Sequence, residues 1–320
     1  VVAGPGNNGG DAWVAAAHLR ETFHRVTVLD VAGTAPKAPE AQEARERFLA
    51  AGGTSVRAWP EGPRPGLVVD GLLGIGLARD VDGDWAALVG RMNGCGAPVL
   101  AIDIPSGLSS DTGCVRGVAV RAARTITFIA RKVGLHTGDA LDHAGDIVVD
   151  DLGVDPALLE GFPGSLVVAE SVRGWLAPRL RNAHKGTYGT LGIIGGGKGM
   201  TGAAILAARA GLLAGAGKVY VGLLAPDPPA FDPMHPELML RSVDDTLAAD
   251  VLVIGPGAGH SPSQTSISAF ERMTLPALLS LPKPLVIDAD ALNAIAIHEA
   301  MRDAIAGNRR APTILTPHPA

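Results

Sequence analysis

The sequence predicts an α/β protein with two three-layer αβα domains, each built on a doubly wound parallel sheet. Short apolar runs rich in β-branched residues, such as "RVTVLD", "PVLAIDIPSG", "KVYVGLLAP" and "KPLVIDADAL", alternate with Ala-rich helical stretches. Strands of a parallel sheet are buried on both faces and therefore read as continuous apolar runs between helices. Turn residues interrupt this alternation once, between about residues 153 and 183. We therefore expect a first, Rossmann-like domain at residues 1–154, a linker at 155–182 and a second domain at 183–320.

Composition excludes several classes of protein. The chain has 320 residues, which is enough for two cores, and only 4% of them are aromatic, so these cores are aliphatic. A net charge of -5 without a basic stripe argues against a nucleic-acid partner. Two cysteines and nine unclustered histidines make neither a disulfide framework nor a zinc site. The low cysteine content favours a cytoplasmic location. The longest uncharged run, "VLVIGPGAGHSPSQTSISAF", is broken by Gly, Pro and Ser, so we expect no membrane partner.

The first motif lies in "VVAGPGNNGGDAWVAAAHL" and matches the G-x-G-x-x-G fingerprint of dinucleotide-binding folds. Asp30 closes the next strand-like run at about the 20-residue distance that this fingerprint requires. A dehydrogenase loop needs only to pass the pyrophosphate, whereas this loop carries Asn7, Asn8 and Asp11 at its apex. Backbone N–H groups at the start of the following helix can bind an anion. We therefore expect a nucleotide site that is not an oxidoreductase site.

Oxygen-bearing side chains follow two further strands of the first half. Asp70 ends the run "LVVD", and Asp103 ends "LAID", three residues before Ser106. Either aspartate alone could be a helix N-cap. Together with Asn8 and Ser106, at one edge of a parallel sheet, they make an all-oxygen pocket that suits a hard cation or a polar ligand.

The motifs "GPGNNGGDA", "VVDGLLGIGL", "AIDIPSGLSSDTG" and "TITFIARKVGL", in this order, resemble the YjeF N-terminal domain, the NAD(P)H-hydrate epimerases. The resemblance covers about residues 1–154, with Ala12 where the family usually has glycine. It implies an enzyme that interconverts the R and S forms of NADHX and NADPHX, which are NADH and NADPH hydrated on the nicotinamide ring. Because the family's leading helical segment is absent and the chain opens inside a strand, we expect it to be part of a longer protein.

The same resemblance implies the roles of individual residues. Asp103 is expected to contact the substrate and to transfer the proton, and Asn8, Asp70 and Ser106 are expected to hold a potassium ion. The substrate-binding residues that it implies are Asn7, Asn8, Gly9, Gly10, Asp11, Gly74, Ile75, Gly76, Leu77, Ala78, Arg79, Asp80, Asp103 and, as a further candidate, Lys132.

The second half carries a similar series of strand ends. "LGIIGGGKGMTGAA" comes close to the P-loop pattern, but Gly199 stands where that pattern requires a hydroxyl for magnesium. "VLVIGPGAGH" supplies another Gly loop, "VIDADALN" places Asp288 and Asp290 beyond a strand, and "TPHP" places His318 likewise. Each of these signals is weak alone.

In series, "HKGTYGTLGIIGGG", "HPELML", "VIGPGAG", "VIDADALN" and "TPHP" resemble the YjeF C-terminal domain, a ribokinase-like NAD(P)H-hydrate dehydratase that uses ADP or ATP, with magnesium. The resemblance covers about residues 183–320. It implies phosphorylation of the ring hydroxyl of the S hydrate, followed by elimination of phosphate to restore NAD(P)H. Ala203, Gly259 and His318 are the implied substrate contacts. The family's G-T-G-D motif is not among these residues, so we expect an incomplete domain and name no catalytic aspartate for it.

The leading hypothesis is therefore a bifunctional enzyme that repairs hydrated nicotinamide nucleotides. The alternatives are a ribokinase-type small-molecule kinase, a non-catalytic nucleotide-binding scaffold and, more remotely, a Rossmann oxidoreductase. Asn8, Asp70 and Asp103 favour an enzyme over a scaffold. The sequence leaves open whether the chain forms a homo-oligomer, which of ADP and ATP is the donor, and which hydrate is preferred.

Overall fold

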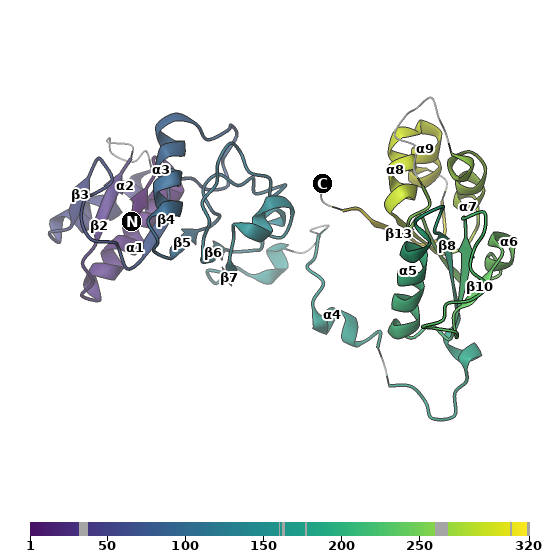
Figure 1. Ribbon diagram of the computed structural model, residues 1–320. Helices are drawn as coiled ribbons and strands as arrows, with labels where there is room; N and C mark the ends of the chain where they lie inside the picture. The colour runs from purple at the N-terminus through teal and green to yellow at the C-terminus, as the bar shows by residue number, and fades with distance from the viewer. Residues whose placement is uncertain are drawn as a thin grey trace. The chain divides into compact units, whose positions relative to one another are not determined.

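The computed structural model describes residues 1–318 except 32–37, 160, 162–163, 177, 260–267 and 308. It divides into two compact units, residues 1–167 and 168–318. Figure 1 labels their helices and strands and colours the chain by residue number. The division falls inside the segment 155–182, whose bounds as a linker stay a prediction. Within the described residues, no helix combines the length and the apolar character that a membrane span requires.

The first unit contains a seven-stranded sheet of order β3-β2-β1-β4-β5-β6-β7. Every pair of neighbouring strands in it is parallel. The strands are β1 (Val2–Ala3), β2 (Thr27–Asp30), β3 (Thr54–Val56), β4 (Val68–Gly71), β5 (Val99–Ile102), β6 (Arg124–Phe128) and β7 (Asp146–Asp150).

Helices cover both faces of this sheet. Val69 of β4 packs in one apolar cluster with Trp13 and Phe48, whereas its neighbour Val68 packs in another with Val89. Successive residues of a strand point to opposite faces, so the two clusters lie on opposite sides of the sheet. Figure 1 shows the two helices of the first cluster, α1 and α2, next to each other. The helices are α1 (Asn7–Glu21), α2 (Pro39–Ala50) and α3 (Gly83–Gly94), with short 3₁₀ turns η1 (Val133–Leu135), η2 (Gly138–Asp142) and η3 (Pro156–Leu159).

The second unit repeats this plan with a six-stranded parallel sheet of order β10-β9-β8-β11-β12-β13. Ile193 packs with Ala204 of α5 on one face, and the adjacent Ile194 packs with Leu275 and Ala291 on the other. The strands are β8 (Thr190–Gly195), β9 (Lys218–Leu223), β10 (Met239–Arg241), β11 (Val251–Ile254), β12 (Leu285–Asp288) and β13 (Thr313–Thr316). The helices are α4 (Ala169–Arg173), η4 (Lys185–Tyr188), α5 (Thr201–Ala214), α6 (Val243–Thr246), η5 (Phe270–Thr274), α7 (Leu275–Leu279), α8 (Ala289–Ile297) and α9 (Glu299–Ala306).

The predicted class, two α/β domains on parallel sheets, is confirmed. In each sheet the chain first runs outward through three strands and then returns to start again beside the first one, between β1 and β4 and between β8 and β11. The loops after these strands diverge, and such switch points are where open α/β sheets bind ligands. Three strands, β3, β7 and β10, are not among the runs that the sequence predicts, and each lies at the edge of its sheet.

The start of α1 touches the strand ends at the first switch point. The amide of Gly4 donates to the carbonyl of Gly71 over 3.0 Å, which joins the turn after β1 to the end of β4. A Cβ on Gly4 would lie 1.8 Å from the carbonyl oxygen of Leu72, and a Cβ on Gly9 would lie 1.9 Å from the carbonyl oxygen of Gly4. Only glycine lets the backbone approach this closely, so these glycines determine where the helix begins.

We predict that Gly9→Ala lowers the free energy of unfolding by about 3 kcal/mol or more, because the new methyl group overlaps backbone atoms that cannot move away. The matched control is Gly6→Ala, since a Cβ on Gly6 meets no heavy atom within 4 Å among the described residues. Urea or thermal unfolding of both variants checks the prediction. Equal stabilities for the two variants would show that the start of α1 packs less closely against the strand ends than described.

Candidate active site

Four segments of the first unit follow the carboxyl ends of adjacent parallel strands. They are the start of α1 after β1, residues 72–82 after β4, residues 103–115 after β5 and residues 129–135 after β6. Because the strands are parallel, these segments share one edge of the sheet. The second segment and the start of α3 line an open cleft of about 460 Å³. Its lining includes Gly76, Leu77, Ala78, Arg79 and Asp80, which the sequence analysis placed in the substrate site.

The carboxylate of Asp70 is completely buried at the end of β4. Its Oδ2 accepts from the amide of Ser106 over 2.8 Å, and its Oδ1 accepts from the Ser106 hydroxyl over 2.6 Å and from the amide of Leu72 over 3.2 Å. Burial raises the pKa of the Asp70 carboxyl, although the hydrogen bonds from Ser106 and Leu72 oppose this shift. The carboxylate therefore fixes the loop after β5 to the end of β4.

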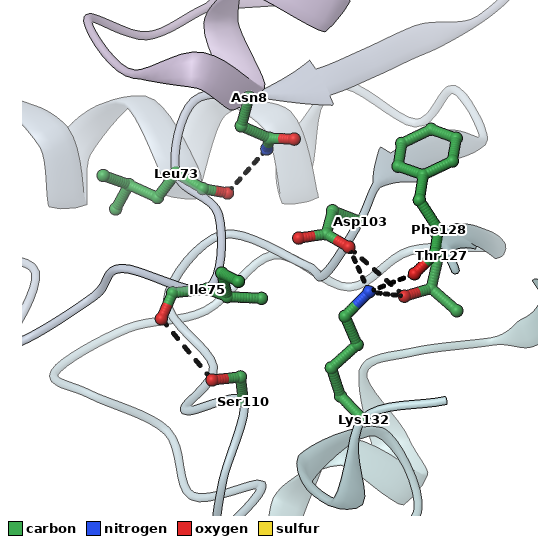
Figure 2. Close-up of polar contacts among 8 residues, drawn as sticks. All are labelled: Asn8, Leu73, Ile75, Asp103, Ser110, Thr127, Phe128 and Lys132. Carbon is green, nitrogen blue, oxygen red and sulfur yellow. Dashed lines mark hydrogen bonds and ion pairs between the residues drawn. The ribbon is translucent and has the colours of Figure 1, made fainter. Parts of the chain in front are cut away.

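Asn8 and Leu73 extend this network to the start of α1. The hydroxyl oxygen of Ser106 accepts from the amide of Leu73 over 2.8 Å, and Asn8 Nδ2 donates to the Leu73 carbonyl over 2.8 Å, as drawn in Figure 2. The remaining side-chain oxygen, Asn8 Oδ1, is buried and accepts no hydrogen bond from any residue that the structure describes. Buried acceptors are normally satisfied, so this oxygen needs a ligand that the protein does not supply.

The oxygens of Asn8, Asp70 and Ser106 fit a cation of low charge. They combine a free amide oxygen, a hydroxyl and one carboxylate, whereas divalent sites usually draw on several carboxylates. Across the described residues, no group of three or more His, Cys, Asp or Glu side chains could hold a metal ion. These are the three residues expected from the sequence to hold potassium; Ser106 contacts Asp70 directly, and the backbone of Leu73 links Ser106 to Asn8.

Asp103 and Lys132 meet on the other side of the same edge. Lys132 Nζ lies 2.5 Å from Asp103 Oδ1, and both side chains are largely buried, with 18% and 15% of their surfaces exposed. The ammonium group also donates to the hydroxyl of Thr127 over 2.6 Å and to the carbonyl of Phe128 over 2.9 Å (Figure 2). The sequence analysis named Asp103 and Lys132 but missed Thr127. The available signal was a hydroxyl next to the end of β6, but a threonine inside a strand is also explained by its β-branched shape alone.

A second residue that the sequence analysis missed is Ser110. Its hydroxyl donates to the carbonyl of Ile75 over 3.4 Å, and its own carbonyl accepts from the amide of Gly134 over 2.7 Å. Ser110 therefore ties the loop after β5 to the loop after β4 and to η1. The predicted contact residues Gly74 and Ile75 lie in this tied loop.

Asp30, which stands where the dinucleotide-binding fingerprint requires an acidic residue, forms an ion pair with Arg45. Asp30 is buried, and its Oδ2 lies 3.3 Å from Arg45 Nε of α2. The guanidinium of Arg45 also lies 5.7 Å from the centre of the Trp13 ring. Asp30 thus joins β2 to α2, which removes the main support for a Rossmann oxidoreductase.

The predicted residues of the second half follow three strands of one sheet. Ala203 lies near the start of α5 after β8, Gly259 follows β11, and His318 follows β13. Asp290 Oδ2 accepts from the amide of Gly259 over 2.9 Å and so holds the loop after β11. A Cβ on Gly257 would lie 2.8 Å from the Cβ of Ala203, which places this loop against the start of α5.

Each half of the chain matches the model of a known protein family. Residues 1–134 match the family model described as YjeF-related protein N-terminus, and residues 191–320 match the model described as NAD(P)H-hydrate dehydratase. The two matches lie in separate halves of the chain. We refer below to the YjeF-related unit and the dehydratase-type unit.

Known bifunctional enzymes are similar over the whole of this chain. The bifunctional NAD(P)H-hydrate repair enzyme Nnr of Escherichia coli K12 is 38% identical over 330 residues, which are 100% of this chain and 61% of that protein. The enzyme of the same name from Coxiella burnetii is 37% identical over 100% of this chain and 64% of its own length. The chain thus spans somewhat less than two thirds of these relatives. A crystal structure of the ADP/ATP-dependent NAD(P)H-hydrate dehydratase from Bacillus subtilis aligns at 27% identity with a TM-score of 0.34, over 47% of this chain and 51% of that one.

In the YjeF-related unit a second carboxylate lies within electrostatic reach of Asp103. Burial and the negative charge of Asp103 both raise the pKa of the Asp11 carboxyl. Between the ordinary carboxyl pKa and this raised value, the native state binds more protons than the unfolded state. The contribution of Asp11 to stability therefore falls as the pH rises through this window.

We predict that Asp11→Asn makes the protein more stable than the unsubstituted chain at neutral pH, and that the gain disappears below the ordinary carboxyl pKa, where Asp11 is protonated in both states. Melting temperatures of both proteins between pH 3 and pH 8 check this. The control for the loss of one negative charge is Asp142→Asn, an exposed position in η2. A gain that is the same at every pH would contradict the assigned cause.

Proposed function

We propose that the YjeF-related unit is an NAD(P)H-hydrate epimerase, which interconverts the R and S forms of NADHX and NADPHX. One observation carries the proposal: a carboxylate fixed by an ammonium group, Asp103 with Lys132, lies at the same sheet edge as the buried oxygen network and the open cleft. Such an edge offers a proton-transfer group next to space for a nucleotide. The name of the relative from Escherichia coli, an NAD(P)H-hydrate repair enzyme that is 38% identical to this chain, supports the substrate.

The chemistry of the hydrate explains why a carboxylate suffices. The ring carbon that carries the hydroxyl is bonded to the ring nitrogen, whose lone pair can displace the protonated hydroxyl as water and form an iminium ion. Water then adds to the opposite face of the same carbon and loses a proton. The reaction consumes and releases one water molecule, so the enzyme needs only to transfer protons. We assign this transfer to Asp103 as general acid and base.

We further propose that Asn8, Asp70 and Ser106 hold a potassium ion. The unsatisfied Asn8 Oδ1 and the buried carboxylate of Asp70 support this proposal. A bound cation would compensate the buried negative charge and would fix the relative positions of the loops after β1, β4 and β5. The proposed substrate contacts in these loops, Asn7 to Asp11 and Gly74 to Asp80, depend on those positions.

For the dehydratase-type unit we propose the second repair step, in which ADP or ATP with magnesium phosphorylates the hydroxyl of the S hydrate and phosphate then leaves. Phosphate is a far better leaving group than hydroxide, which explains the use of a phosphoryl donor. Ala203, Gly259 and His318 are the proposed contacts with the hydrate, and Asp290 holds Gly259. The cytoplasmic location and a homo-oligomer stay predictions.

The test measures the conversion of purified R-NADHX to the S form in potassium and in tetramethylammonium buffers. Chromatography monitors the conversion. We predict conversion by the unsubstituted chain that is faster in potassium, and a loss on the order of 100-fold or more in Asp103→Asn, which cannot accept the proton. Asp142→Asn is the matched control for charge and should retain the rate. Adding ADP or ATP with magnesium then measures the second step as recovery of NADH absorbance.

A folded chain that leaves R-NADHX unconverted would contradict the epimerase proposal and favour the non-catalytic scaffold. Conversion that survives in Asp103→Asn would retain the activity but remove the assigned proton-transfer group. Phosphorylation of a small molecule other than the hydrate by the second unit would favour the kinase alternative.

A further inference from the structure

The ammonium group of Lys132 has no donor left for a substrate. A protonated lysine offers three N–H donors. Those of Lys132 are directed at Asp103 Oδ1, at the Thr127 hydroxyl and at the Phe128 carbonyl, over 2.5, 2.6 and 2.9 Å. The Thr127 side chain is itself completely buried. A lysine held in this way fixes its neighbours and does not contact a ligand.

The ion pair leaves the two oxygens of Asp103 in different situations. Oδ1 accepts from Lys132 and, over 3.3 Å, from the hydroxyl of Thr127. Oδ2 has no hydrogen-bond partner within the described part of the chain. Figure 2 shows this second oxygen pointing away from Lys132, on the side where Leu73 and Ile75 are drawn. One oxygen is therefore held by the protein, and the other faces the site.

The backbone at both ends of this contact is strained. Asp103 has a φ of 66° directly after β5, and Ile129 has a φ of 66° directly after β6. The left-handed region is unfavourable for residues other than glycine, above all for a β-branched residue such as Ile129. Ile129 follows Phe128, whose carbonyl accepts from Lys132. Strain of this kind persists where the surrounding structure fixes a functional geometry.

The main chain around Lys132 is fixed as well. Lys132 precedes η1, and its carbonyl accepts from the amide of Leu135, which is buried. The preceding amide, that of Gly134, donates to the Ser110 carbonyl, and a Cβ on Gly134 would lie 2.1 Å from the carbonyl oxygen of Ser109. The lysine therefore starts from a backbone that is locked against the loop after β5, the loop that begins with Asp103.

We propose that Lys132 is a positioning residue: with Thr127 and the Phe128 carbonyl it fixes Oδ1 of Asp103, so that Oδ2 alone meets the reacting hydroxyl of the hydrate. This proposal rests on the proposed epimerase function and replaces the substrate contact that the sequence analysis expected for Lys132. Lys132 acts through Asp103 and has no proton to exchange with the substrate. Thr127 belongs to the same arrangement, because its hydroxyl contacts both partners.

The test compares Lys132→Met, Asp103→Asn and the double variant in the R-NADHX assay. A lysine that acts only through Asp103 lowers kcat on the order of 100-fold when it is removed, as misplacement of a catalytic group does, and leaves KM unchanged. The double variant should be no slower than Asp103→Asn alone, because the aspartate that Lys132 positions is already inactive. Arg131→Met, at the exposed neighbouring cation, is the matched control and should retain kcat.

Two results with the Lys132 variants would overturn the proposal. A rise in KM with unchanged kcat would make Lys132 a substrate contact, and independent, multiplying losses in the double variant would give it a function of its own. Thr127→Val and Thr127→Ser provide a second series in case Lys132→Met does not fold. We expect the valine variant to lose kcat and the serine variant, which keeps the hydroxyl, to retain it. Equal rates for valine and serine would also contradict the proposal.

A measurement that needs no turnover separates this proposal from the proposed function. If Lys132 and Asp103 pair as described, the loss of melting temperature in the double variant is smaller than the sum of the two single losses. Additive losses would show that the pair does not form in solution. Coupled losses in a chain that does not convert R-NADHX would confirm the ion pair but overturn both the epimerase function and the positioning of Asp103 for it.

Discussion

The buried carboxylate of Asp70 is the interaction on which the arrangement of the YjeF-related unit's site depends. It accepts from the backbone and side chain of Ser106, whose hydroxyl in turn accepts from the amide of Leu73. The Leu73 carbonyl then accepts from Asn8 at the start of α1. One charged group at the end of β4 thereby sets the positions of the segments that follow β1, β4 and β5. A buried charge is costly unless it is compensated, and donors from uncharged groups compensate it only in part. This explains our proposal of a cation beside Asn8.

The two units share the order of their first six strands but differ in the contacts of their strand-end carboxylates. In both, glycine-rich turns follow the first and fourth strands of the unit, on either side of the switch point. In the YjeF-related unit the strand-end carboxylate of Asp103 keeps one oxygen that accepts from no donor among the described residues. In the dehydratase-type unit Asp290 accepts from the amide of Gly259, and Asp288 accepts from the hydroxyl of Thr316 over 2.7 Å. There the two carboxylates hold loops, so neither is assigned a reactive role in the proposed second step.

The sequence predicted the central strands because their physical situation leaves a strong pattern. Strands buried on both faces, such as β4 and β11, appear as unbroken apolar runs. Three edge strands were missed: β3 and β10 have only three residues each, and β7 alternates exposed and half-buried residues between Asp146 and Asp150. The site was predictable where chemistry-bearing residues stand at strand ends, as Asp70 and Asp103 do. It was not predictable where a residue acts through a distant partner, as Thr127 and Ser110 do, because that pairing exists only in three dimensions.

We propose that Asn8, Asp70 and Ser106 form a cradle for one monovalent cation at the first switch point. The most direct measurement is anomalous diffraction at the rubidium absorption edge, from crystals of the chain grown in rubidium chloride, since rubidium is a close substitute for potassium. We predict a single strong peak beside Asn8 Oδ1 that disappears in Asn8→Ala and remains in Asn7→Ala, where the substituted side chain is exposed. A well-ordered cradle without a peak, or a peak that Asn8→Ala leaves unchanged, would contradict the claim.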